Sequence, residues 1–158
     1  MTAYPDTSFL CALYRRQANT AEAVAHRGSM KEPLAVTALL LFEFRQSVRW
    51  QTFLHRSDAS KGYTGREGSK MLADLQSDLS EELVKMEPVD WARVFSTAEQ
   101  LSAQYTSEHG YRGFDILHVA TAIELGATEF LTFDAVQSGL AKAAGLRVKP
   151  RERAPKRA

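Results

Sequence analysis

Short apolar runs alternate with longer segments of helical periodicity along this chain, and this alternation is what most restricts its fold. The clearest run is residues 130–133, Phe-Leu-Thr-Phe, whose aromatic content predicts a buried strand. Strands that alternate with helices form a parallel sheet with helices on both faces. The sequence therefore predicts an α/β fold, with strands expected near residues 2–5, 33–36, 83–86, 129–133 and 146–149.

Capping residues and glycines mark the expected helices between these strands. Thr37 and Asp90 are expected N-caps, Thr7 or Ser8 is expected to cap the first helix, and Gly110 is expected to end a helix. The polar segment 57–69 contains three glycines and predicts a loop between two helices. Helices are expected near residues 9–14, 38–54, 70–79, 91–109, 115–125 and 135–144.

Composition predicts one globular domain in a reducing compartment. The chain has 158 residues, of which 44% are hydrophobic, enough for one packed core. A single cysteine, Cys11, excludes an intrachain disulfide, and its apolar neighbours favour a small core residue over a reactive thiol. No run has the length of a membrane span or the polarity of a signal peptide, so a cytoplasmic protein without membrane contact is expected.

Charge is distributed unevenly and defines an expected boundary near residue 149. Residues 147–158 contain six basic side chains and one acidic one, which leaves residues 1–146 with a net charge of −4. We expect a domain over residues 1–149 and a basic, disordered tail over residues 150–158. A solvated end is favoured over a nucleic-acid contact for this tail.

Four acidic residues are placed where a shared site can form. Asp6 and Asp134 follow expected strands, and Asp115 lies in the first turn of an apolar helix. In open α/β sheets, the carboxyl ends of the strands lie along one edge, where ligands bind. Glu43 lies within the expected helix 38–54, which must lean over the same edge for Glu43 to join the other three.

Each acid also has a purely structural interpretation. Asp6 suits a turn, Asp115 and Asp134 suit helix caps, and Glu43 can pair with Arg45 on the surface. The joint pattern, rather than any one residue, favours a site.

A cluster of four carboxylates requires protons or a cation. Two carboxylates 4 Å apart repel by about 4 kcal/mol at an effective dielectric near 20. Oxygen ligands favour Mg²⁺ or Mn²⁺ over zinc. Such an ion can polarise a phosphoryl oxygen and help to ionise a water, which is the chemistry of phosphodiester hydrolysis.

The segments that carry these acids resemble those of the PIN-domain nucleases, in particular the VapC-type toxins of bacterial toxin–antitoxin pairs. The resemblance covers residues 2–148 and rests most on two blocks, Arg-Gly-Phe-Asp-Ile-Leu-His-Val-Ala-Thr-Ala at 112–122 and Leu-Thr-Phe-Asp at 131–134. Asp-Thr-Ser at 6–8 and the helix-borne Glu43 are less specific matches. Pro5 and the very polar stretch 55–70 depart from the family pattern.

The resemblance implies a three-layer α/β/α fold with a mainly parallel sheet of four to five strands. It also implies a Mg²⁺-dependent endoribonuclease that acts on RNA, forms a homodimer and is held inactive by a cognate antitoxin. Asp6, Glu43, Asp115 and Asp134 would then be the metal ligands. Thr7 and Thr132 would support these ligands or a phosphate, and Arg112 would face the substrate.

Two other functions remain open from the sequence. One is a catalytically inactive PIN-like scaffold that binds RNA or protein. The other is a phosphoacceptor signalling domain, although that class has adjacent acids after its first strand, and here Asp6 stands alone.

Several further residues are given structural roles. His118 is expected to be a hydrogen-bonded core histidine rather than a support for Asp115. Aromatic residues on two helices are expected to serve helix packing or a subunit interface rather than base stacking: Trp50, Phe53, Trp91 and Phe95.

Overall fold

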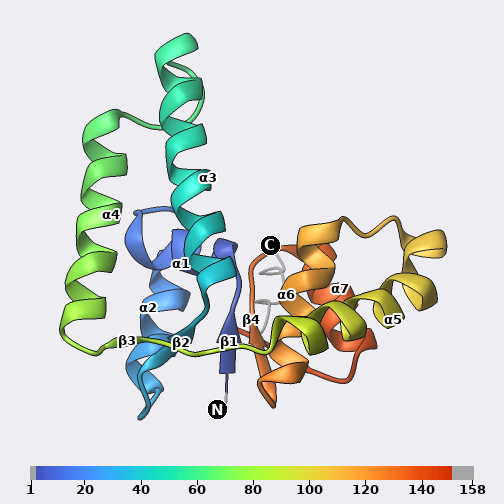
Figure 1. Ribbon diagram of the computed structural model, residues 1–158. Coiled ribbons are helices and arrows are strands. Elements are labelled where there is room, and N and C mark those ends of the chain that lie inside the picture. Colours follow the sequence, from blue (N-terminus) through green and yellow to red (C-terminus); the bar gives the residue numbers. More distant parts are fainter. Residues whose placement is uncertain (1–2, 151–158) are drawn as a thin grey trace, which may run out of the picture. The chain divides into compact units, whose positions relative to one another are not determined.

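The computed structural model describes residues 3–150, which form two compact units (Figure 1). Unit 1 contains residues 3–6 and 89–150, and unit 2 contains residues 7–88. The tail predicted to be disordered lies, from residue 151 onward, outside the described residues.

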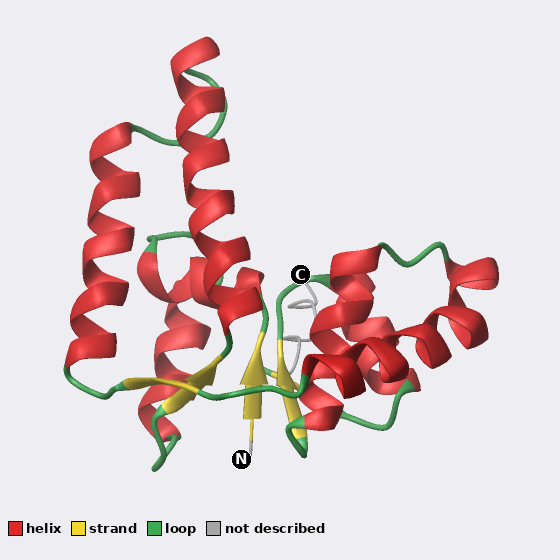
Figure 2. Ribbon diagram, in the orientation of Figure 1, coloured by secondary structure: helices red, strands yellow, loops and turns green. Residues whose placement is uncertain are grey.

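Unit 1 is built on a three-stranded parallel sheet in the order β1-β4-β5, of which β1 and β4 are seen as neighbouring arrows in Figure 2. The strands are β1 (Ala3–Pro5), β4 (Glu129–Leu131) and β5 (Arg147–Lys149). The proline that departs from the family pattern is the last residue of β1, and the next amide, of Asp6, donates to the Leu131 carbonyl at 2.9 Å. Pro5 therefore does not interrupt the pairing of β1 with β4.

The helices of unit 1 begin and end where the sequence predicts, to within two residues. α5 (Trp91–His109) is capped by Asp90 and ends at Gly110, which has a left-handed φ of 67°. α6 (Gly113–Glu124) packs against both α5 and α7 (Ala135–Ala143). His118 of α6 is fully buried and lies 3.2 Å from the Tyr4 hydroxyl, so the prediction of a hydrogen-bonded core histidine is confirmed.

Unit 2 combines a two-stranded parallel sheet with four helices. β2 (Leu34–Val36) pairs with β3 (Val84–Met86). The predicted N-cap is confirmed, because the Thr37 hydroxyl accepts a hydrogen bond from the Leu40 amide at 3.4 Å. The helices are α1 (Thr7–Tyr14), α2 (Thr20–Ser29), α3 (Ala38–Ser57) and α4 (Gly65–Ser80).

The structure corrects two helix predictions in unit 2 and adds one helix that was not predicted. α4 begins at Gly65 rather than near Lys70, because Thr64 and Glu67 form a reciprocal capping box inside the expected loop. α1 begins at Thr7, so neither Thr7 nor Ser8 precedes the helix as a cap. α2 was not predicted, since it buries only Ala23 and has no apolar stripe.

The predicted α/β class with parallel strands is confirmed. Five strands are present in the described residues, and every pair between them is parallel. Their pairing differs from the expectation of one sheet, since they form a three-stranded and a two-stranded sheet. Within residues 3–150, no helix combines the length and the apolar character that a membrane crossing requires.

The loop between α3 and α4 depends on one glycine. Gly62 has a left-handed φ of 58°, and a Cβ atom added there would lie 2.0 Å from the Gln51 carbonyl oxygen. We expect Gly62→Ala to lower the free energy of unfolding by more than about 1 kcal/mol, because backbone strain and a clash with main chain add together. Gly110→Ala is the matched control, since it has a similar φ of 67° with nothing within 4 Å. Urea unfolding measures both variants, and equal losses of unfolding free energy would contradict the role of the clash.

Candidate active site

Asp6 and Thr132 meet at the carboxyl edge of the three-stranded sheet. Asp6 follows β1, and Thr132 follows the neighbouring strand β4. The Asp6 side chain is 0% exposed, and its Oδ2 accepts a hydrogen bond of 2.5 Å from the Thr132 hydroxyl. A buried carboxylate is costly unless polar partners or a cation stabilise its charge. Thr132 therefore contacts one of the predicted site residues, and its role in supporting a metal ligand stays a prediction.

Asp134 belongs to the same cluster. Its backbone amide donates to the Thr132 hydroxyl at 2.8 Å, so one threonine connects Asp6 to Asp134. Its carboxylate caps α7, with Oδ1 accepting from Val136 and Gln137 amides at 2.7 and 2.9 Å. The structural interpretation of Asp134 as a cap is therefore correct. The cap uses Oδ1, which leaves the other carboxylate oxygen for a further ligand.

Asp115 lies in the first turn of α6, as predicted, and is partly buried. Its Oδ2 accepts from the backbone amide of Arg112 at 3.3 Å, which ties the carboxylate to the start of the helix. The Arg112 side chain is exposed, as a contact with substrate requires.

Glu43 and Thr7 form a pair in unit 2. The Thr7 hydroxyl donates to Glu43 Oε2, joining the start of α1 to the second turn of α3. Glu43 is partly buried between Phe42, which is exposed, and Phe44, which is in the core. Thr7 follows Asp6 in the sequence, so the partner of Glu43 is the residue next to the buried carboxylate.

The predicted site residues thus form an Asp6–Thr132–Asp134 cluster, a Thr7–Glu43 pair, and Asp115 at the start of α6. Within residues 3–150, no three His, Cys, Asp or Glu side chains are arranged to hold a metal ion. The four-ligand metal site stays a prediction.

Tyr4 was not predicted from the sequence to contribute to this region, although it lies on the strand that leads to Asp6. Tyr4 is fully buried on the middle of β1, contacts the Phe130 ring with a centroid distance of 6.1 Å, and shares a hydrogen bond with His118. Its position two residues before Asp6 was the available signal, because alternate residues of a strand lie on one face.

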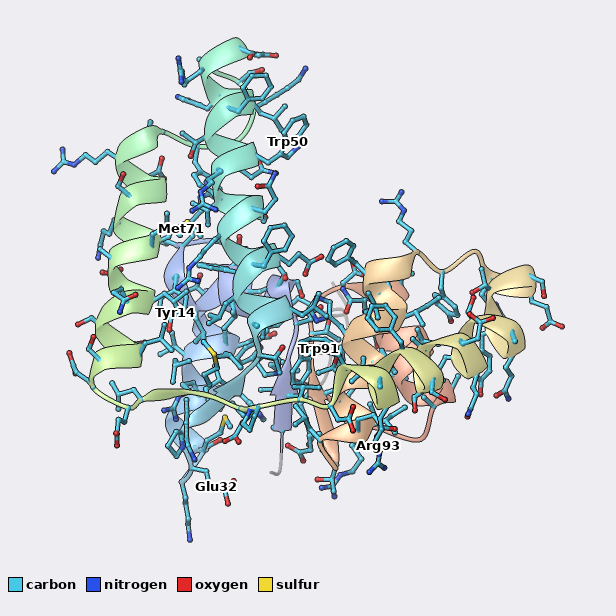
Figure 3. All side chains as sticks on the ribbon, in the orientation of Figure 1. Tyr14, Glu32, Trp50, Met71, Trp91 and Arg93 are labelled. Carbon is cyan, nitrogen blue, oxygen red and sulfur yellow. The ribbon has the colours of Figure 1, made fainter. Side chains whose placement is uncertain are left out.

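Helix α3 carries exposed aromatic side chains, which were predicted from the sequence to serve helix packing or a subunit interface. Trp50 and Phe53 are 53% and 54% exposed and stack on each other with centroids 5.4 Å apart. Trp50 projects away from α3 (Figure 3). Helix packing within unit 2 therefore does not account for these two residues.

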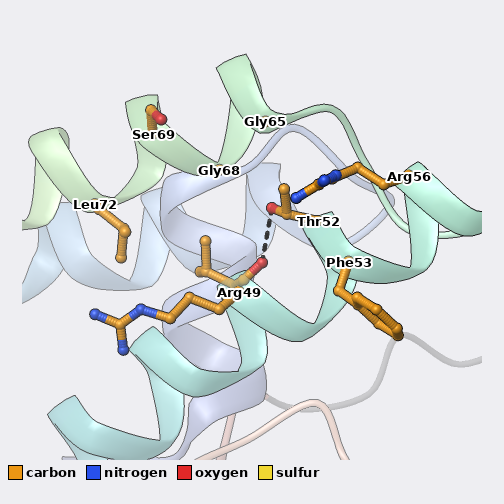
Figure 4. A pocket seen from close by; sticks show the side chains of 9 residues that line it. Arg49, Thr52, Phe53, Arg56, Gly65, Gly68, Ser69 and Leu72 are labelled. Carbon is orange, nitrogen blue, oxygen red and sulfur yellow. Dashed lines mark hydrogen bonds between the residues drawn. The ribbon is translucent and has the colours of Figure 1, made fainter.

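A groove of about 280 Å³ lies between α3 and α4, beside Phe53 (Figure 4). Val48 and Leu72 line it with apolar side chains, and Arg49 and Arg56 also belong to its lining. The lining of this groove thus combines apolar side chains with two positively charged ones.

Comparison with known proteins decides the family. The PIN domain family model matches residues 3–143, most of the chain. The chain belongs to the PIN domain family. This PIN domain has no match among curated protein sequences.

Solved structures give the same fold at low identity. VapC20 of Mycobacterium tuberculosis, described as a sarcin-ricin loop cleaving toxin, is 22% identical, with a TM-score of 0.61 over 92% of this chain and 96% of that one. FitAcB from Neisseria gonorrhoeae is also 22% identical, with a TM-score of 0.65 over 93% and 96% of the two chains. VapBC2 from Rickettsia felis, solved with a promoter DNA fragment, is 12% identical, with a TM-score of 0.66 over 94% and 98%.

Proposed function

We propose that this PIN domain is a Mg²⁺-dependent endoribonuclease and the toxin of a toxin–antitoxin pair. The observation that carries the proposal is the buried Asp6 carboxylate, held by Thr132 at the carboxyl edge of a parallel sheet beside Asp134. Family membership and the description of VapC20 as a loop-cleaving toxin support the choice of RNA as substrate.

The chemistry of the donors fits a hard cation. Asp6, Glu43, Asp115 and Asp134 offer only oxygen atoms, which Mg²⁺ prefers, and Mn²⁺ is the natural substitute. We propose these four as the ligands. When bound, the ion supplies Lewis-acid activation of the phosphodiester and of the attacking water.

The other residues of the site position these ligands. Thr132 fixes Asp6 and Asp134 through one hydroxyl, and Thr7 fixes Glu43. Such outer hydrogen bonds orient the ligating oxygens and commonly change metal affinity or activity by about 10- to 100-fold. We propose that the exposed Arg112 contacts a phosphate of the RNA, because a guanidinium matches phosphate geometry.

We further propose an antitoxin partner, a homodimer and a cytoplasmic location. VapBC-5 from Mycobacterium tuberculosis, a structure of the same fold, is described as a member of the VapBC family of toxin-antitoxin systems, which supports an antitoxin partner. The exposed Trp50 and Phe53 on α3 are suited to a protein interface, since large aromatic side chains anchor such interfaces.

Metal removal tests the proposed activity. We expect the purified protein to cleave RNA in Mg²⁺, to lose cleavage in EDTA, and to regain it when Mg²⁺ or Mn²⁺ is restored in excess. A structured stem-loop and an unstructured oligonucleotide should both be used, with products resolved on denaturing gels. Cleavage that persists in EDTA would contradict the metal site. Binding of RNA without cleavage in any metal would favour the inactive scaffold.

A further inference from the structure

Unit 2 has a second pocket, and none of the residues assigned to RNA cleavage lines it. It has a volume of about 320 Å³, and its wall comes from α1, the segment that follows α1, α3, α4 and the loop before α4. This volume is at the lower end of the range for small-molecule sites. The residues that line it are Cys11, Arg15, Gln17, Ser47, Gln51, Gly62, Tyr63 and Met71.

The charge of this wall is positive. Arg15 is its one charged side chain, and no acidic residue belongs to the lining. Arg15 Nε forms a long ion pair with Glu67 Oε1 at 3.9 Å, a separation at which Glu67 accepts no hydrogen bond from this atom. The other oxygen of Glu67 accepts from the Thr64 amide and hydroxyl, so this carboxylate is already engaged in capping α4.

Two donors in this wall are buried without an acceptor in the described residues. They are Arg15 Nε and the Tyr63 hydroxyl, and Tyr63 is only 7% exposed. The Arg15 guanidinium lies over the Tyr63 ring, 4.8 Å from its centroid, so the two groups form one unit. A buried donor without an acceptor costs roughly 1–3 kcal/mol, and a bound acceptor would remove that cost.

The wall is fixed before any ligand binds. The Gly62 backbone packs against the carbonyl of Gln51, and His55 Nδ1 lies 3.0 Å from the Lys61 carbonyl oxygen. Burial raises the pKa of Tyr63 to about 12, so its hydroxyl remains a donor throughout the neutral range. A pocket that is already formed loses little free energy to ordering on binding.

We propose that this pocket binds a small oxyanion, a carboxylate or a phosphate, through Arg15 and Tyr63. The guanidinium offers charge and N–H donors, and the tyrosine offers a hydroxyl donor. Ser47 and Gln51 add neutral polar groups on the α3 side.

Cys11 provides a direct test, because it is the sole cysteine and lines the pocket. The full chain is treated with iodoacetamide, and the alkylation rate of Cys11 is followed by mass spectrometry. The probes are inorganic phosphate and citrate, each compared with sodium chloride at equal ionic strength, and Tm is measured in the same buffers. We expect at least one probe to slow alkylation by about fivefold or more near saturation and to raise Tm with concentration.

Paired variants assign the effect to this pocket. Arg15→Gln should abolish both the protection and the Tm increase, whereas Arg16→Gln, the same charge change on an exposed neighbour, should retain both. Tyr63→Phe keeps the ring beneath Arg15 and removes only the hydroxyl, so the affinity should fall by about fivefold, the value of one hydrogen bond. Tyr63→Phe also tests the proposal if Arg15→Gln does not fold.

The proposal would be overturned if neither probe acts beyond sodium chloride, or if Arg15→Gln and Arg16→Gln behave alike. Protection by phosphate but not citrate would assign a phosphate ligand, and the reverse would assign a carboxylate. RNA cleavage is not a readout here, so the outcome is independent of the proposed nuclease.

Discussion

Replacement of Asp6, Asp115 or Asp134 by asparagine is expected to lower Mg²⁺-dependent RNA cleavage by about 100- to 1,000-fold each, the usual cost of removing one group that stabilises charge at a reacting centre. Asparagine has nearly the same shape and retains a carbonyl oxygen that accepts hydrogen bonds. The bonds from Thr132 to Asp6 and from the Arg112 amide to Asp115 can therefore remain. The change removes the negative charge that is proposed to hold the cation. Initial rates of cleavage at saturating RNA measure the effect.

Asp90→Asn is a closely matched control. Asp90 caps α5 as Asp134 caps α7, each through Oδ1 and the amides two and three residues onward. Asp90 does not follow a strand of the three-stranded sheet, so its replacement should leave cleavage unchanged. Asparagine is also as good an N-cap as aspartate, so both helices should persist. Equal losses in Asp90→Asn and Asp134→Asn would show that Asp134 serves only the helix.

Phe130→Ala is expected to lower the free energy of unfolding by about 3–5 kcal/mol, the range for a buried phenylalanine that leaves a cavity. Phe130 is 0% exposed on β4, the middle strand of its sheet, and contacts the Tyr4 ring. Urea unfolding followed by circular dichroism measures the loss.

Phe95→Ala supplies the comparison for this substitution. Phe95 lies on α5 and is 58% exposed, so the same change should alter stability by no more than about 0.5 kcal/mol. A similar loss in both variants would mean that burial on β4 does not control stability.

The sequence predicted most of unit 1 because its signals are local. Asp90 and Gly110 bound α5, and residues 130–133 combine apolar and aromatic side chains ahead of Asp134. N-caps, left-handed glycines and buried strands act through neighbouring residues, so each can be recognised without knowing the tertiary fold.

The sequence predicted less where structure depends on distant partners. α2 has almost no apolar stripe, and the polar loop 58–64 contains the capping residue that starts α4 early. Cys11 was expected in the core but is only partly buried in the wall of a pocket, because its surroundings come from α3, α4 and the loop between them. Likewise, the bond from Thr132 to Asp6 spans 126 positions, and no local pattern reveals it.

Unit 1 is interrupted in the sequence, and this has a consequence for how the protein is made. β1 leaves the ribosome before the other two strands of its sheet, since its neighbour β4 begins at Glu129 and β5 ends at Lys149. The whole of unit 2 is synthesised in between. The Asp6–Thr132 contact therefore cannot exist in any nascent chain shorter than 132 residues. A translation product that stops before β4 carries Asp6 and Glu43 but lacks the edge of the sheet that would complete a nuclease, so synthesis itself withholds the proposed activity until β4 and β5 have been made.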